Sequence, residues 1–181
     1  MITGDLPAVQ ANAPAGSCFD AQPALNEIVD DVLIFVQFEE IDGPGDILGE
    51  AGPCYIRNGS GLPILGQLRL DAADLERMET NGTLDAVVAH EIGHVLGFGT
   101  LWKRANLLTG VGTDDPQFNG TAALAEYRKL GGGEVGVPVE NTGSEGTREG
   151  HWRESVFGHE LMTGYVSRGT NPLSAMSAAS M

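Results

Sequence analysis

Residues 82–99 constrain the fold more than any other part of the chain. They read G-T-L-D-A-V-V-A-H-E-I-G-H-V-L-G-F-G, and the apolar residues recur with the period of an α-helix. At about 100° per residue, His90, Glu91 and His94 fall together beside a continuous apolar stripe. The sequence therefore predicts a helix that carries chemical groups on one face and core residues on the adjoining face.

The two ends of this helix are also marked in the sequence. Thr83 is the predicted N-cap, and Asp85 falls in the first turn, where a negative charge suits the helix dipole. Gly97 and Gly99 follow the last apolar residues and predict where the helix stops.

The pattern H-E-x-x-H places His90 and His94 one helical turn apart, with Glu91 beside them. Two imidazoles at this spacing can bind one divalent metal ion, and the carboxylate can take a proton from the water that the ion activates. This arrangement is typical of zinc hydrolases. The alternative is an amphipathic helix whose histidines have this spacing by coincidence. The capped helix in the right register favours the metal site.

Composition excludes several classes of partner. The chain has 10 Lys and Arg against 25 Asp and Glu, which gives a net charge of −15 at pH 7. Such a surface should repel nucleic acid and anionic membranes. No stretch is long and apolar enough for a membrane span. The 26 glycines lie between apolar runs and predict long ordered loops.

The part of the chain before the helix predicts a small twisted sheet. Residues 32–38 are β-branched and aromatic and fit a buried strand. Residues 54–57 and 64–70 fit two more strands, joined across the turn at 58–61. The acidic segment 71–79 predicts a brief helix. Strands followed by a long helix indicate the α+β class.

We expect one domain over residues 1–181, because this length can bury a single core. It would comprise an extended arm (1–24), an upper lobe with the sheet and the helix (25–99), and a loop-rich lower lobe (100–181). The lower lobe has one helical patch, at 121–130, and many Gly, Thr, Asp and Asn residues. Such loops need something to order them, and a third protein ligand to the same metal would do so.

Cys18 and Cys54 are the only cysteines of the chain. An even number fits one disulfide in an exported protein, which is the interpretation that we favour. Two free thiols in a cytosolic protein are the alternative.

Two acidic groups are candidate calcium sites: Asp42 with Asp46, and Asp114 with Asp115 near Asn119. Both also fit tight turns, in which Asp side chains accept hydrogen bonds from the backbone, and this is the simpler explanation.

A third zinc ligand must lie outside the helix, since catalytic zinc takes three protein ligands and keeps one position for water. The common metzincin pattern, H-E-x-x-H-x-x-G-x-x-H, would place a histidine at position 100, where this chain has Thr100. The remaining histidines are His151 and His159.

The residues around His151 give the chain a resemblance to a known family. His151-Trp152 is followed, eleven residues after the histidine, by the methionine of Glu160-Leu161-Met162. Together with H-E-x-x-H-x-x-G-F, these residues resemble the leishmanolysin-like (M8-type) zinc metalloproteases of the metzincin clan, whose third histidine follows a long insertion. The resemblance covers roughly residues 25–175.

The resemblance implies a zincin or metzincin-like fold and a zinc endopeptidase, secreted or at the cell surface, that acts on protein or peptide substrates. Zinc is the implied cofactor. The implied zinc ligands are His90, His94 and His151, and Glu91 is the implied general base. Met162 would be the methionine of the Met-turn beneath the metal.

The resemblance carries three further expectations. Gly97 would turn the chain between the lobes, and a peptide substrate would pair with an edge strand around residues 54–57. Family members usually have a strand and a long helix before the segment that resembles residues 32–38, and a closing helix after the Met-turn. We therefore expect this chain to be trimmed at both ends.

Other assignments stay open. His159 is more simply a surface residue, and Glu126 would be the third ligand of a gluzincin-type site. Tyr165 stands three residues after Met162, one position later than the oxyanion-stabilising tyrosine of some metzincins. The alternative function is a zinc-stabilised binding or adhesion module without activity. In a latent enzyme, Cys18 would coordinate the zinc.

Overall fold

The computed structural model of the protein describes residues 5–181, and residues 1–4 of the expected arm lie outside the described part. The chain forms two compact units, one ending at Gly97 and the other spanning residues 98–181.

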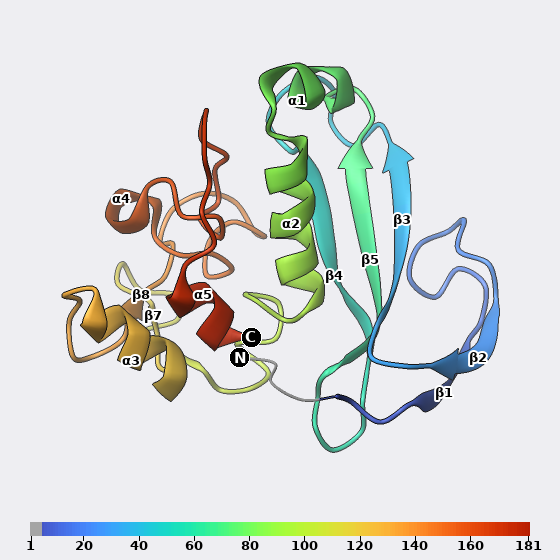
Figure 1. Ribbon diagram of the computed structural model, residues 1–181, viewed down its shortest axis with the longest axis horizontal. Coiled ribbons are helices and arrows are strands. Elements are labelled where there is room, and N and C mark those ends of the chain that lie inside the picture. The colour runs from blue at the N-terminus through green and yellow to red at the C-terminus, as the bar shows by residue number, and fades with distance from the viewer. Residues whose placement is uncertain (1–4) are drawn as a thin grey trace. The chain divides into compact units, whose positions relative to one another are not determined.

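The unit that ends at Gly97 contains all the longer strands (Figure 1). The middle of its three-stranded sheet is β5, which pairs in parallel with β3 and antiparallel with β4. A separate antiparallel pair joins β1 and β2. The elements of this unit are β1 (Val9–Ala13), β2 (Leu25–Val29), β3 (Leu33–Glu39), β4 (Gly49–Ile56), β5 (Pro63–Asp71), α1 (Leu75–Asn81) and α2 (Leu84–Val95).

Helix α2 packs along one face of this sheet, over β4 and β5. Leu68 and Leu70 of β5 point to this face and form a buried cluster with Met78 and Val87. Gly66 allows the helix to lie close, because a Cβ at this position would be 2.3 Å from Cγ1 of Val95. The apolar stripe of α2 and the alternation of β5 therefore fix the helix against the sheet.

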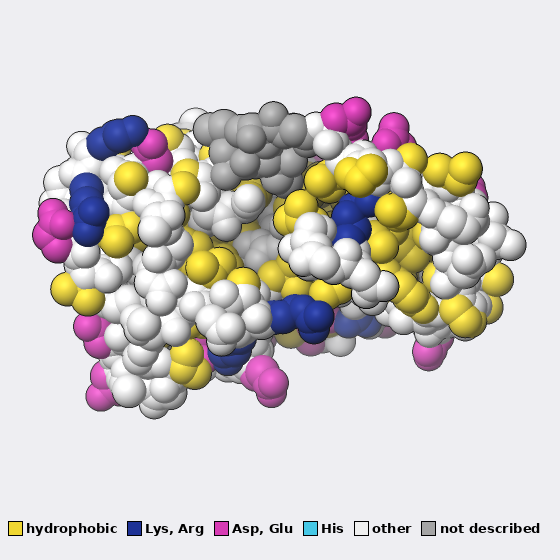
Figure 2. Space-filling view, turned by 90° about the horizontal axis from the view of Figure 1, so that it is seen from below, with side chains coloured by type: hydrophobic (Ala, Val, Ile, Leu, Met, Phe, Trp, Pro, Cys, Tyr) yellow, Lys and Arg dark blue, Asp and Glu magenta, His cyan; other side chains and the backbone are white. Residues whose placement is uncertain are grey.

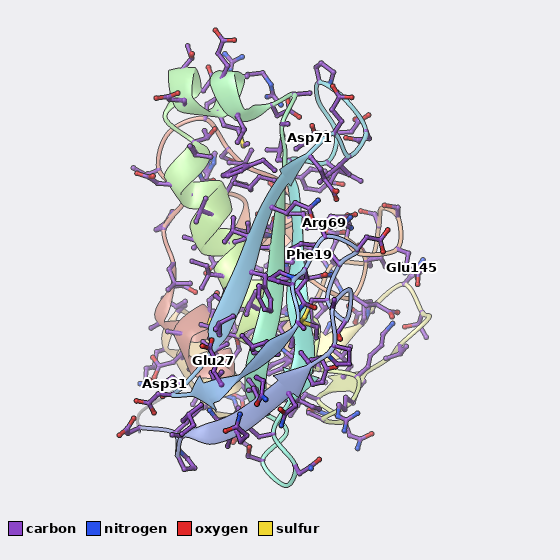
Figure 3. All side chains as sticks on the ribbon, turned by 90° about the vertical axis from the view of Figure 1, so that its right-hand side faces the viewer. Phe19, Glu27, Asp31, Arg69, Asp71 and Glu145 are labelled. Carbon is purple, nitrogen blue, oxygen red and sulfur yellow. A yellow bond between two sulfur atoms is a disulfide. The ribbon has the colours of Figure 1, made fainter. Side chains whose placement is uncertain are left out.

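Residues of the expected arm cover the other face of the sheet. Phe19 packs edge to face on Phe35, with ring centroids 6.2 Å apart (Figure 3). The expected disulfide is present between Cys18 and Cys54. The arm is more regular than a loop, because residues 9–13 form β1 and pair with β2.

Strand and helix positions follow the sequence pattern closely, with one strand longer than predicted. The runs at 32–38 and 64–70 correspond to β3 and β5, and the segment 71–79 overlaps α1. Strand β4 begins at Gly49, five residues before the predicted start. Its first residues are Gly, Glu, Ala, Gly and Pro, which have low strand propensity, so sequence alone did not reveal them.

The unit of residues 98–181 is built mostly from loops around one aromatic cluster. Its three strands have two residues each and form an antiparallel sheet in the order β6-β7-β8. The rings of Trp102 and Trp152 lie at its centre, with centroids 4.9 Å apart. The elements are β6 (Leu108–Thr109), β7 (Gln117–Phe118), α3 (Thr121–Lys129), β8 (Val137–Pro138), α4 (Glu154–Phe157) and α5 (Ala175–Ser180).

Together these elements make a mixed α+β protein. On the face shown in Figure 2, apolar side chains are more plentiful over the half that contains β1 and β2. The most exposed of these strands' apolar side chains is Ile28 of β2, at 70%. None of the helices in the described residues has the length and apolar character needed to cross a membrane.

Candidate metal centre

Helix α2 begins and ends where the sequence predicts, but one cap differs. Thr83 occupies the N-cap position, yet its hydroxyl does not bond the first turn and lies 3.4 Å from the carbonyl oxygen of Met78. The N-cap prediction is therefore wrong in its chemistry. Asp85 lies in the first turn, and Gly97 follows the C-cap with φ of +109°, a conformation that suits glycine.

His90 and His94 lie side by side on α2. Their Nε2 atoms are 2.9 Å apart, and the two rings are nearly perpendicular, with centroids 4.6 Å apart. His94 is buried and His90 is half-buried. One helical turn thus brings two imidazole nitrogens to the same place, as a shared ion requires.

Glu91 is buried, with 5% of its surface exposed. Burial raises the pKa of its carboxyl group to about 8, and the neighbouring Glu50 carboxylate adds to the shift. The carboxyl group lies against the first residue of β4, since a Cβ at Gly49 would be only 3.1 Å from Oε1 of Glu91. The start of β4, which the sequence pattern missed, therefore borders the predicted general base.

His151 is buried in the unit of residues 98–181, and its ring is fixed by its neighbours. Its Nδ1 lies 3.0 Å from the carbonyl oxygen of Thr147. A carbonyl oxygen only accepts hydrogen bonds, so Nδ1 carries the proton and Nε2 has the lone pair. Gly164 lies against the same ring, where an added Cβ would be 3.7 Å from Cγ of His151. Hydrogen bonding of this kind commonly orients a histidine that binds a metal.

Met162 lies in the core beside the residue that follows His151. It is fully buried in the aromatic cluster, and its carbonyl oxygen accepts a hydrogen bond of 3.0 Å from the backbone N–H of Trp152. The segment that contains the predicted Met-turn is thus joined directly to the segment of the predicted third ligand.

Gly99 and Gly150 cross at very close range. Gly99 has φ of +70°, and a Cβ there would lie 2.0 Å from the carbonyl oxygen of Gly150. Only glycine, which adopts positive φ readily and has no Cβ, fits at this position. Because Gly150 directly precedes His151, this crossing limits where the imidazole can lie.

The three histidines form a candidate metal site. One ring nitrogen from each of His90, His94 and His151 can be chosen so that all three atoms lie within 4.8 Å of one another. Three neutral imidazoles are a ligand set that divalent zinc takes in catalytic sites. The side chains present therefore fit a zinc ion.

Comparison with protein families agrees with this geometry. The model of the leishmanolysin family, peptidase M8, matches residues 25–180. The chain belongs to the leishmanolysin family. This match confirms the resemblance found in the sequence. Members of the family are metallopeptidases that typically use zinc. A search of curated proteins finds no match.

The other candidate ligands of this leishmanolysin-family chain are engaged elsewhere or lie apart from the triad. His159 is exposed and belongs to no group of three ligand side chains within residues 5–181. Glu126 forms an ion pair with Lys129, and Cys18 is in the disulfide. The disulfide excludes the latent form in which Cys18 binds zinc. Tyr165 is 52% exposed.

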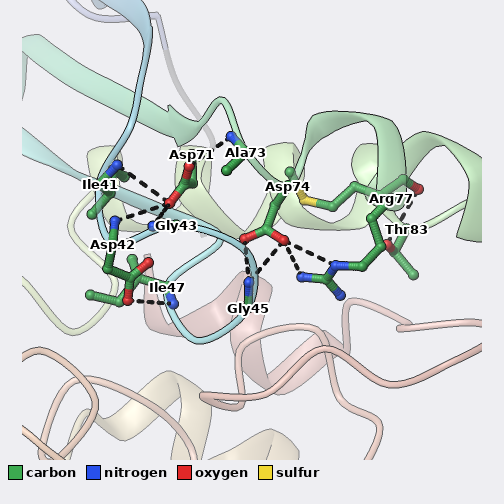
Figure 4. Close-up of polar contacts among 11 residues, drawn as sticks. Ile41, Asp42, Gly43, Gly45, Ile47, Asp71, Ala73, Asp74, Arg77 and Thr83 are labelled. Carbon is green, nitrogen blue, oxygen red and sulfur yellow. Dashed lines mark hydrogen bonds and ion pairs between the residues drawn. The ribbon is translucent and has the colours of Figure 1, made fainter.

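The calcium interpretation of Asp42 and Asp46 finds no support. Asp42 accepts a hydrogen bond from the backbone N–H of Ile47. The buried Asp71 accepts three more from the loop between β3 and β4, from the backbone N–H groups of Ile41, Asp42 and Gly43 (Figure 4). The loop is therefore held by hydrogen bonds from its own backbone to carboxylates, the arrangement of a turn.

Asp114 and Asp115 also belong to no metal-binding group within the part of the chain that the structure describes. Asp115 forms an ion pair with Arg153, which holds the pKa of its carboxyl group below the ordinary value. The carbonyl oxygen of Asp114 accepts a hydrogen bond from the side chain of Asn141. Both residues are thus explained by local structure.

Three buried glutamates surround the third-ligand segment, and the sequence predicted no role for any of them: Glu140, Glu149 and Glu160. Glu149 pairs with Lys103, which lowers the pKa of its carboxyl group, and it also accepts the backbone N–H of Gly112. Glu140 accepts the backbone N–H groups of Asn141, Thr142 and Glu154. No sequence pattern marks Glu140 or Glu149, whereas Glu160 stands in the E-L-M segment.

Proposed function

We propose that this protein is a zinc-dependent endopeptidase with His90, His94 and His151 as metal ligands and Glu91 as general base. The observation that carries the proposal is the grouping of the three histidines in a chain of the leishmanolysin family. Glu91 supports it, because the carboxyl group neighbours two of these ligands on α2 and is buried away from bulk water.

In this proposal a zinc ion supplies Lewis-acid activation of a water molecule and of the scissile carbonyl. The residues of the chain do the rest. The imidazoles hold the ion, and the hydrogen bond at Nδ1 of His151 keeps the lone pair on Nε2. Glu91 takes the proton of the attacking water and returns it to the leaving amine.

Strand β4 is the proposed partner of the peptide substrate. It is an outer strand of the sheet, and its first residue, Gly49, lies against the Glu91 carboxyl group. Pro53, which lacks an N–H, also fits an outer strand. A peptide that paired with residues 49–52 would run past the general base.

The finer features of the family enter as parts of the same proposal. We include a metzincin arrangement of two lobes in one catalytic domain. The positive φ of Gly97 fits its role as the turn between the lobes. The burial of Met162 fits its role as the methionine of the Met-turn beneath the metal. Secretion or display at the cell surface is supported by the Cys18–Cys54 disulfide, since disulfides persist in oxidising compartments.

Cleavage of an unfolded protein substrate, measured with and without a zinc chelator, tests the proposal. We expect cleavage that the chelator abolishes. Glu91→Gln should retain zinc and lower turnover by about 100-fold or more. The control is Glu79→Gln, an exposed position in α1, which should cleave like the parent protein. Zinc binding with no cleavage by the parent would instead favour the inactive binding or adhesion module.

A further inference from the structure

The indole of Trp152, the residue after the proposed third ligand, is hydrogen-bonded to helix α5. Its Nε1–H donates to the hydroxyl of Ser177 at 2.7 Å. Trp152 and Ser177 are both fully buried. A buried indole N–H needs an acceptor, and here the acceptor comes from 25 residues further along the chain.

Ser177 in turn donates its hydroxyl hydrogen to Oε1 of Glu160. The same carboxylate oxygen accepts the hydroxyl of Ser174 at 2.7 Å and its backbone N–H at 3.0 Å. The other oxygen, Oε2, accepts the backbone N–H of Met162 at 2.6 Å. Glu160 therefore joins the start of α5 to the Met162 segment.

These hydrogen bonds close a ring. Trp152 is bound to the Met162 segment directly, through its backbone N–H and the Met162 carbonyl oxygen. It is bound a second time through its indole, by way of Ser177 and Glu160. Two attachments fix both the position and the orientation of Trp152, and its backbone continues directly into His151.

We propose that Ser177 is a positioning residue for the third metal ligand. Its hydroxyl is the only link in the ring that both accepts from the Trp152 indole and donates to the Glu160 carboxylate. Without it, the indole of Trp152 loses its hydrogen bond and is oriented by ring packing alone, and His151 gains freedom to move. The inference rests on the proposed function, because it takes His151 as a zinc ligand.

The affinity for zinc, measured by competition with a chromophoric chelator, tests the inference. Ser177→Ala should bind zinc about 10-fold more weakly, as is common when a group that orients a ligand is lost. Trp152→Phe removes the same hydrogen bond from the other side and should weaken zinc binding similarly. The double variant should bind zinc no more weakly than the worse single variant, because each single variant already breaks the same indirect attachment of Trp152 through Ser177. Ser177→Thr, which keeps a hydroxyl, should recover most of the affinity.

Two controls separate positioning from general loosening of the core. Ser180→Ala makes the same change on the same helix. The Ser180 hydroxyl donates to the backbone carbonyl oxygen of Ser177 and not to the ring, so this variant should bind zinc like the parent. Leu124→Ala removes apolar contacts with the same aromatic cluster and should lower the urea midpoint of the zinc-free protein without weakening zinc binding more than about twofold.

Parental affinity in Ser177→Ala, additive effects in the double variant, or an equal loss in Leu124→Ala would overturn the inference and leave the zinc site standing. Failure of the parent protein to bind zinc would overturn the proposed function, and this inference with it.

Discussion

The two units of the molecule place their proposed catalytic groups by different means. In the unit that ends at Gly97, a single helix carries His90, Glu91 and His94, and their relative positions follow from the helical repeat. In the unit of residues 98–181, His151 lies in an irregular segment. Its position depends on hydrogen bonds to residues distant in the sequence and on the close crossing of Gly99 and Gly150.

This difference shows by which contacts a loop can hold the side chain of a proposed metal ligand. A helix satisfies its backbone internally, whereas the loops of the second unit need other acceptors. Buried carboxylates supply them: Glu140 and Glu160 accept backbone N–H groups from residues before and after His151 in the chain. The cost of burying these charges is offset by several hydrogen bonds to each.

Substitution of Gly99 is the most direct way to disturb the contacts that hold His151 in the second unit. Gly99→Ala should destabilise the protein by roughly 2–4 kcal/mol, because the new Cβ meets the Gly150 carbonyl oxygen and the backbone has positive φ. Zinc affinity should fall as well, since Gly150 precedes His151. Urea unfolding and chelator competition measure the two effects.

Gly131→Ala is the matched control for that experiment. Gly131 also has positive φ, of +87°, but a Cβ there would meet nothing within 4 Å. It should cost only about 1–2 kcal/mol and leave zinc affinity unchanged. Equal losses in both variants would show that the backbone conformation matters and the close crossing does not.

Gly49 offers the corresponding change in the first unit. In Gly49→Ala the Cβ would press on the Glu91 carboxyl group and on the Arg69 carbonyl oxygen, each about 3 Å away. We expect kcat/KM to fall about 10-fold while zinc affinity is retained, because the base is displaced and the ligands are not. Gly133→Ala, at an open position with ordinary backbone geometry, should behave like the parent. Loss of zinc from Gly49→Ala would contradict the expectation that the substitution displaces the base and leaves the metal ligands in place.

The smallest expected effect concerns Asp71, which shows that the first unit also uses carboxylates to hold a loop. The backbone N–H of Asp42, followed by those of Ala73, Ile41 and Gly43, keeps the pKa of Asp71 below its ordinary value of 3.8. The contribution of Asp71 to stability is therefore present above about pH 4 and is lost as the pH falls through the lowered pKa.

Asp71→Asn should accordingly have a lower urea midpoint than the parent at pH 7, and the difference should shrink below pH 3.8. A difference that stays constant down to pH 2.5 would mean that the charge of Asp71 does not hold the loop.

The sequence predicts the secondary structure and the proposed site residues of the first unit better than those of the second. Periodicity and propensity locate α2, β3 and β5, because neighbouring residues decide these elements. They place His90 and His94 side by side without any other knowledge. The start of β4 escapes prediction, since its Gly, Ala and Pro residues are held in the strand by pairing with β5.

The His151 segment is different, because no local pattern distinguishes His151 from His159. Only the resemblance to a family, through Trp152 and Met162, selected His151, and the structure groups it with the two helical histidines. The roles of Glu140 and Ser177 could not be predicted, since each depends on contacts across long stretches of chain.

The disulfide has a consequence for the order in which the protein is made. Cys18 and Cys54 both precede α2, so the covalent bond joins two segments that leave the ribosome early. Synthesis at about 5–20 residues per second needs roughly 3–11 s for the 54 residues from 98 to 151. Cys18, Cys54 and the two helical histidines proposed as metal ligands are therefore all translated several seconds before His151, and the cross-link can begin to form in that interval.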